Sequence, residues 1–101
     1  MSQFDPFKDF RMQGHSAIVT GGAQNIGEAI ARSFAGAGAK VMIADLNRDK
    51  AEATAQKIAA ETGGEVIAMA CDVTDDEQID ACVARTAEAF GGVSTLVNNV
   101  G

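Results

Sequence analysis

The sequence predicts a doubly wound α/β fold with a parallel sheet, built from strands and helices in the order βαβαβαβ. Short apolar runs rich in β-branched residues alternate with longer segments whose apolar residues recur at helical spacing. The connections between these segments are only a few residues long, which favours right-handed crossovers and a parallel sheet. In the usual doubly wound arrangement the strands have the order 3-2-1-4, with the fourth strand at an edge.

The first two predicted strands enclose the first predicted helix. Residues 16–20 (SAIVT) and 40–44 (KVMIA) are short apolar runs, typical of strands buried on both faces. The helix between them is expected to start near Ile26 and to stop at Gly38. Its apolar face is expected to contain Ile26, Ile30, Phe34 and Ala37.

The second predicted helix leads into the third strand. The side chain of Asn47 can cap the start of this helix, and Gly63 with Gly64 provides its end. Residues 65–71 (EVIAMAC) then have the character of a strand. The apolar face of the helix is expected to contain Ala51, Ala55, Ile58 and Ala59.

The third predicted helix joins the last strand. Thr74 and Glu77 have the spacing of a capping box, and the glycines that follow Phe90 end the helix. Residues 93–97 (VSTLV) form the fourth strand. The buried face of the helix is expected to contain Ile79, Val83, Ala87 and Phe90. Because an unpaired apolar edge strand is an aggregation hazard, we expect more sheet to follow Gly101.

Composition and charge narrow the possible functions. The chain has 101 residues, of which 47% are hydrophobic and 22% charged, as in an ordinary globular domain. The net charge of -6 leaves no basic stripe for a nucleic acid. No apolar run approaches the ~20 residues that cross a bilayer, so we expect neither a nucleic-acid nor a membrane partner.

Cys71 and Cys82 lack a C-x-x-C spacing and are interpreted as reduced core residues of a cytoplasmic protein. The acidic segment 72–80 lacks the glycine of a calcium loop, and no metal site is expected.

The segment between the first strand and the first helix has the character of a phosphate-binding loop. Residues 20–27 read TGGAQNIG. A helix start offers free backbone N–H groups and the positive end of the helix dipole, both of which suit a diphosphate. Gly21 permits a sharp turn off the strand, and Gly27 allows the helix to pack closely on the sheet. The general pattern G-x-G-x-x-G is not met, because Gln24 stands where its second glycine would fall.

An acidic residue follows the second predicted strand. A carboxylate at the position of Asp45 can accept hydrogen bonds from both hydroxyls of an adenosine ribose. The same carboxylate would repel a 2′-phosphate, so NAD is favoured over NADP as the cofactor. Arg48 and Lys50 lie nearby in the sequence and leave some tolerance of NADP open.

Four segments in order resemble the short-chain dehydrogenase/reductase family, which has a Rossmann-type fold. They are TGGAQNIG at 20–27, Asp45, CDVTD at 71–75 and NNVG at 98–101. The family pattern is T-G-x-x-x-G-x-G, then an acid in NAD-dependent members, D-V after the third strand and N-N-A-G after the fourth. The resemblance covers residues 14–101, which we interpret as the N-terminal part of an NAD-binding Rossmann domain.

The resemblance assigns roles to individual residues. It implies that Asp72 and Val73 flank the adenine ring, and that the Asn98–Asn99 segment steadies the sheet beside the cofactor. The expected cofactor-binding residues are Gly21, Gly22, Gln24, Asn25, Ile26, Gly27, Asp45, Leu46, Asp72, Val73, Asn99 and Gly101, and neither a catalytic nor a metal-binding residue is expected in the chain.

Two positions depart from the family pattern. Asn25 occupies the place of the middle glycine; asparagine tolerates positive φ better than most residues, so the turn is expected to survive. Val100 replaces the usual alanine, which we interpret as a packing variation.

The resemblance implies hydride transfer between a nicotinamide ring and a secondary alcohol or ketone, with a tyrosine as the general acid/base. A serine and a lysine four residues after that tyrosine assist it, and the resemblance also implies a dimeric or tetrameric parent protein. The chain contains no tyrosine, so we expect these 101 residues to be inactive alone. The substrate stays open among steroids, sugars, polyols and oxoacyl compounds, with some similarity to hydroxysteroid dehydrogenases.

Two other functions and the role of the N-terminal arm stay open. The chain could be a non-catalytic nucleotide-binding module or degenerate gene product, or a Rossmann domain that binds S-adenosylmethionine. Residues 1–13 carry Phe4, Phe7 and Phe10, and this arm is expected to pack on its own domain or on a neighbouring subunit.

Overall fold

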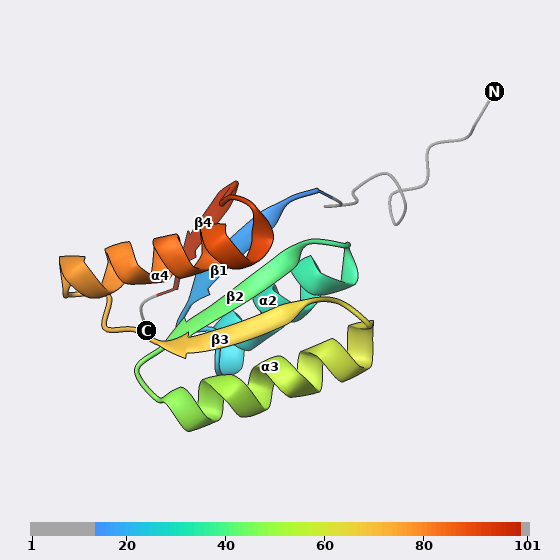
Figure 1. The fold of residues 1–101 in the computed structure, drawn as a ribbon. Helices are drawn as coiled ribbons and strands as arrows, with labels where there is room; N and C mark the ends of the chain where they lie inside the picture. Colours follow the sequence, from blue (N-terminus) through green and yellow to red (C-terminus); the bar gives the residue numbers. More distant parts are fainter. Residues whose placement is uncertain (1–13, 100–101) are drawn as a thin grey trace.

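The computed structural model describes residues 14–99, in which parallel strands and helices alternate along the chain (Figure 1). The elements are β1 (Ser16–Thr20), α2 (Asn25–Gly36), β2 (Lys40–Asp45), α3 (Arg48–Thr62), β3 (Val66–Ala70), α4 (Asp76–Phe90) and β4 (Thr95–Asn98). The strands form one sheet in the order β3-β2-β1-β4, which confirms the predicted topology. The predicted arm at 1–13 and the predicted site residue Gly101 lie outside the described residues.

Helices cover both faces of the sheet, with α2 and α3 on one face and α4 on the other (Figure 1). Alternate strand residues point to opposite faces, which is why the two central strands are apolar at successive positions. One core cluster joins Val19, Val41 and Ile43 to α2 and α3. The other joins Ile18, Met42 and Ala44 to α4.

The carboxyl ends of the strands meet at one edge of the sheet. In the parallel register Thr20 lies beside Ala44 on β2 and beside Asn98 on β4, while Asp45 lies beside Ala70 on β3. The loops that follow the strands therefore lie next to one another, although their sequences are far apart. This edge is where open α/β sheets bind ligands.

The structure confirms the predicted capping of α3. The side chain of Asn47 accepts a hydrogen bond from Lys50 N at 3.0 Å, which satisfies one free donor of the first turn. Gly63 ends the helix in the left-handed conformation with φ of 72°. Ala51, Ala55 and Ile58 are buried as predicted, and the predicted core residue Ala59 is only partly buried.

The predicted buried face of α2 is wrong by about one position. The residues in full contact with the sheet are Gly27, Ala31 and Ala35, whereas Ile26 is 69% exposed. Small residues let the helix axis lie close to the strands, so the large side chains of Ile30 and Phe34 pack at the sides of the contact. The predicted pattern followed the large residues and missed this small-residue face. The helix also ends at Gly36, so Ala37 is its cap rather than part of its face.

The predicted start of α4 is also wrong. Asp75, not Thr74, caps the helix, and its carboxylate accepts a hydrogen bond from Glu77 N at 3.0 Å. The hydroxyl of Thr74 instead donates to Asp72 Oδ1 at 2.7 Å. The carboxylate of Asp75 accepts the free N–H of the first turn, and the carboxylate of Asp72 binds the Thr74 hydroxyl. The Thr74 hydroxyl therefore does not cap the helix.

The predicted buried face of α4 is only partly right: Ile79, Ala87 and Phe90 are partly buried, and Ile79 and Phe90 pack on the core. Cys82 and Thr86 are its buried residues, while Val83 is 38% exposed beside the exposed Leu96 of β4. Within residues 14–99 α4 packs mainly on β1 and β2. The ends of strands β3 and β4 differ by one or two residues from the predicted ranges 65–71 and 93–97. Among the described residues no helix is long and apolar enough to cross a membrane.

The two cysteines are free and buried, as predicted, in the core between the sheet and α4. Burial raises the pKa of the Cys82 thiol from its ordinary 9.0 to about 11, and burial also raises the pKa of Cys71. Their low exposure and raised pKa values make both thiols poor nucleophiles at neutral pH.

The raised pKa of Cys82 predicts a loss of stability in alkali. The unfolded thiol ionises near pH 9.0, whereas the folded thiol keeps its proton to about pH 11. The stabilisation is therefore complete below pH 9 and is lost as the pH rises toward 11. The free energy of unfolding of the wild type should approach that of Cys82→Ala over this range, as measured by urea unfolding with reductant present. A difference between the two proteins that is independent of pH would contradict this assignment.

Candidate nucleotide-binding site

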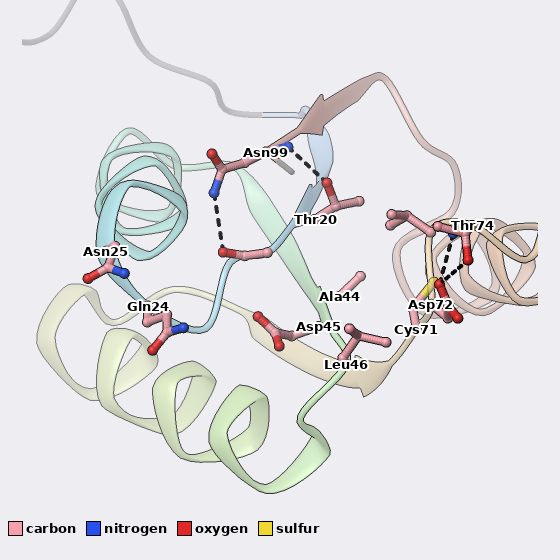
Figure 2. A pocket seen from close by; sticks show the side chains of 12 residues that line it. Thr20, Gln24, Asn25, Ala44, Asp45, Leu46, Cys71, Asp72, Thr74 and Asn99 are labelled. Carbon is pink, nitrogen blue, oxygen red and sulfur yellow. Dashed lines mark hydrogen bonds between the residues drawn. The ribbon is translucent and has the colours of Figure 1, made fainter. Parts of the chain in front are cut away.

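A cavity of about 460 Å³ lies at the carboxyl edge of the sheet (Figure 2). The 12 residues that line it lie at the carboxyl ends of the strands or in the segments that follow them: Thr20, Gly21, Gln24, Asn25, Ala44, Asp45, Leu46, Cys71, Asp72, Val73, Thr74 and Asn99. Figure 2 shows the side chains of Asp45, Leu46 and Asp72 around the same space, opposite Asn99. A cavity of this volume at this edge of the sheet suits a small-molecule ligand.

Close backbone contacts fix the loop after β1. Gly21 has φ of 63°, and its N–H donates to Ala44 O at 2.8 Å. A Cβ at Gly21 would lie 2.3 Å from Asn99 O, and one at Gly27 would lie 2.0 Å from Gly21 O. No side chain fits at either position, and at Gly21 the positive φ also favours glycine. The contacts bring the start of α2 against the ends of β1 and β4.

The start of α2 lies at the wall of the cavity. Gln24 is the cap residue in an extended conformation, and it lines the cavity together with Asn25. Asn25 has φ of 57°, which confirms that asparagine makes the turn at the position where the family pattern has glycine. The first N–H groups of a helix have no acceptor within it, and they carry the positive end of the helix dipole. The wall at this place therefore favours an anion.

Hydrogen bonds of Thr20 join the loops after β1 and β4. Its hydroxyl accepts from Asn99 N at 2.9 Å and lies 3.0 Å from Asn98 Oδ1, to which it can donate. The side chain of Asn99 in turn donates to Gly21 O at 3.4 Å. The two loops therefore hold each other at the end of the cavity nearest β4 (Figure 2).

Asp45 at the end of β2 links the loop after β1 to the start of α3. Its Oδ2 accepts from Ala23 N at 3.3 Å, and its Oδ1 accepts from Asn47 N at 3.1 Å. An ionised carboxylate has about four acceptor positions, so about two remain for a ligand in the cavity. The neighbouring Leu46 is 74% exposed and gives the same rim an apolar side chain.

Asp72 supplies a second carboxylate to the cavity. Its Oδ1 accepts from the backbone N–H of Thr74 at 2.9 Å and from the hydroxyl of Thr74. These hydrogen bonds lower the pKa of Asp72, so the group stays ionised at neutral pH. None of the lining residues within the described part of the chain is basic. The cavity therefore has two negative side chains and no compensating positive side chain in its wall.

The structure brings most of the predicted site residues to this cavity. Gly21, Gln24, Asn25, Asp45, Leu46, Asp72, Val73 and Asn99 line it. Gly22 and Gly27 do not, because they are buried against the core and the loop backbone, and Ile26 points to solvent. Within residues 14–99 no cluster of side chains suits a metal ion.

Sequence reasoning missed four lining residues: Thr20, Ala44, Cys71 and Thr74. Three of them stand at or directly after the carboxyl end of a strand, and the register of the sheet would have placed them there. Thr74 is found from its spacing to Asp72, because an aspartate often bonds the backbone two residues later.

Comparisons with known proteins agree with this geometry. The profile of a family described as short chain dehydrogenase matches residues 15–101. Over 89 residues the chain is 45% identical to a sorbitol dehydrogenase of Cereibacter sphaeroides, with 88% of this chain and 33% of that protein covered. It is 38% identical over 93 residues to the 7alpha-hydroxysteroid dehydrogenase of Escherichia coli, with 92% and 36% covered. The crystal structure of a hydroxysteroid dehydrogenase from Escherichia coli superimposes with a TM-score of 0.88 at 37% identity, covering 93% of this chain and 38% of that one. The chain thus spans about a third of the length of these relatives.

The close contact at Gly27 predicts a large effect of a single methyl group. Gly27→Ala places a Cβ 2.0 Å from Gly21 O, and either the loop or α2 must shift. The loss of stability should reach the upper end of the about 1–3 kcal/mol typical for overpacking. In the control Gly36→Ala, in the same helix, the nearest atom is Thr62 Cγ2 at 4.0 Å. That substitution should stabilise the protein by up to about 1 kcal/mol. Urea unfolding of both variants checks the pair, and equal effects would refute the packing argument.

Proposed function

The chain belongs to the short-chain dehydrogenase family, and we propose that it is the NAD-binding N-terminal part of an oxidoreductase that interconverts a secondary alcohol and a ketone. Bound NAD supplies the hydride acceptor of that reaction, and the residues of this chain hold its ADP half. Family membership favours this cofactor over S-adenosylmethionine. The observation that carries the proposal is the carboxylate of Asp45 beside a glycine loop that leaves no room for side chains.

The loop after β1 has the properties that a diphosphate requires. Gly21 lets the chain turn off β1 at the cavity wall, and Gly27 lets the start of α2 pack closely against that turn. The first N–H groups of α2 are donors without helical acceptors. Two negative charges on the ligand would be stabilised by the positive end of the helix dipole. We therefore assign the diphosphate to the side of the cavity lined by Gly21, Gln24 and Asn25.

Asp45 has the free acceptor capacity that a ribose diol requires. Two of its acceptor positions are occupied by Ala23 N and Asn47 N, and the two that remain match the two hydroxyl donors of the sugar. The adenine ring would then extend toward Leu46, Asp72 and Val73, which line the same wall. In this arrangement Asp45 both orders the loop and fixes the orientation of the ligand.

The charges of the cavity support NAD rather than NADP. A 2′-phosphate would add negative charge beside Asp45 and Asp72, and the wall offers no basic side chain to offset it. The nearby cations are also engaged by other partners: Arg48 lies 3.2 Å from Glu52 Oε1, and Lys50 donates to Gln24 Oε1. We therefore propose NAD as the cofactor.

The proton transfer that accompanies hydride transfer needs residues outside these 101. The family resemblance implies a tyrosine for this step, and the sequence contains none. The relatives include a sorbitol dehydrogenase, a D-threitol dehydrogenase and a 7alpha-hydroxysteroid dehydrogenase, which supports a secondary alcohol as the substrate class. We further propose a cytoplasmic location, because free buried cysteines suit a reducing compartment.

The assignment of Asp45 predicts a specific loss of cofactor affinity. Asp45→Asn removes the charge that accepts the ribose hydroxyls, so the Kd for NADH should rise about tenfold or more. The preference for NADH over NADPH should narrow at the same time. The control Asp49→Asn removes an exposed carboxylate that does not line the cavity, and its affinities should match the wild type. Calorimetric titration of the full-length protein that the gene encodes measures each value. Tighter binding of NADPH than NADH by the wild type would refute the proposed cofactor.

We propose that this chain binds the cofactor and that residues outside it transfer the proton. The full-length protein and the 101-residue chain should therefore differ in activity. The full-length protein should reduce NAD in the presence of a secondary alcohol from a panel of polyols and hydroxysteroids. The 101-residue chain alone should show no turnover, because it contains no tyrosine for the proton transfer. The absorbance of NADH follows both reactions. Turnover by the short chain would contradict the division, and inactivity of the full-length protein on every alcohol would favour a non-catalytic binding module.

A further inference from the structure

Thr54 makes a buried hydrogen bond from the middle of α3 to the loop after β1. Its hydroxyl donates to Ala23 O at 2.8 Å, and the side chain is one of the few buried polar groups of the described chain. Ala23 itself is 1% exposed, so its carbonyl has little access to water. A buried carbonyl needs a partner, and α3 supplies it.

The bond differs from those of the other helical threonines. Thr62 donates to Ile58 O at 2.8 Å, and Thr86 donates to Cys82 O at 2.7 Å, each within its own helix. A helical threonine usually bonds the carbonyl of the preceding turn in this way. Thr54 instead donates to Ala23 O in the loop after β1, so its hydroxyl stabilises the loop rather than its own helix.

Two side chains hold Ala23 from different elements. Its N–H donates to Asp45 Oδ2 at 3.3 Å, and its carbonyl accepts from Thr54. The nitrogen and the carbonyl of one residue belong to successive peptide groups, so both groups have a fixed orientation. The second group also contains the N–H of Gln24, which is antiparallel to the Ala23 carbonyl in a trans peptide. Because the carbonyl points to α3, the N–H of the helix cap points away from α3.

We propose that Thr54 is a positioning residue for the diphosphate of the cofactor. Its hydroxyl holds the peptide between Ala23 and Gln24 in the orientation that presents the N–H groups at the start of α2 to the phosphate oxygens. The inference rests on the proposed function, because it assigns the diphosphate to this loop. Thr54 does not line the cavity and acts only through the loop backbone.

The proposal is tested by removing the hydroxyl while keeping the shape of the side chain. Thr54→Val leaves the Ala23 carbonyl buried without its donor, and both side chains are β-branched, so the helix is little affected. In the full-length protein the affinity for ADP should fall about tenfold. The affinity for adenosine, which lacks phosphate, should stay within about twofold. Thr54→Ser keeps the hydroxyl and should restore ADP binding.

Thr86→Val is the matched control, because Thr86 is also buried but bonds only its own helix. An NMR titration with ADP and with adenosine measures the affinities, and urea unfolding measures the stability of each variant. A selective loss of ADP affinity in Thr54→Val supports the proposal. An equal loss for both ligands, or the same loss in Thr86→Val, would overturn it as a general loss of stability.

Amide hydrogen exchange separates this inference from the proposed function. A wild type that binds no ADP would refute the proposed function alone. The exchange of the amides of residues 22–25 should still be faster in Thr54→Val than in Thr86→Val if Thr54 holds the loop. Unchanged exchange at these amides would overturn the positioning role whether or not ADP binds.

Discussion

The structure depends on one close approach, in which the start of α2 packs against the ends of β1 and β4 with no side chain between them. The Cβ position of Gly27 is occupied by Gly21 O, and that of Gly21 by Asn99 O. This approach explains why α2 contacts the sheet through Gly27, Ala31 and Ala35 rather than through its large residues. It also places the N-terminus of a helix directly at the cavity, which joins the packing of the core to the chemistry of the site.

Around this contact the loops are held by hydrogen bonds from neighbouring strands and helices. Thr20 ties the loop after β4 to β1, and Asp45 with Thr54 ties the loop after β1 to β2 and α3. Each bond joins segments that are distant in sequence. The site is therefore assembled by the sheet as a whole. Its negative charge comes from Asp45 and Asp72, which the parallel order of β2 and β3 brings to the same edge.

Sequence patterns predicted those features that are controlled locally. Asn47 and Gly63 are fixed by the rules of helix ends, and Asn25 by its tolerance of positive φ. The alternation of apolar runs with helical periods predicted the succession of strands and helices, and the usual doubly wound arrangement then supplied the strand order. The contact face of α2 and the exposure of Val83 depend instead on which element covers each helix, and this is a property of the assembled fold. The partner of Thr54 was beyond prediction for the same reason, because a hydroxyl in a helix has an acceptor in its own preceding turn.

The shared use of Asp45 has a thermodynamic consequence. One carboxylate is the acceptor for the backbone of the glycine loop and faces the space where a sugar would lie. Ordering of the loop and recognition of the sugar are then linked equilibria, and each must change the other by the same factor. Reciprocity of this kind needs no movement of domains: one side chain that contacts both the loop and the ligand is enough to couple the two equilibria.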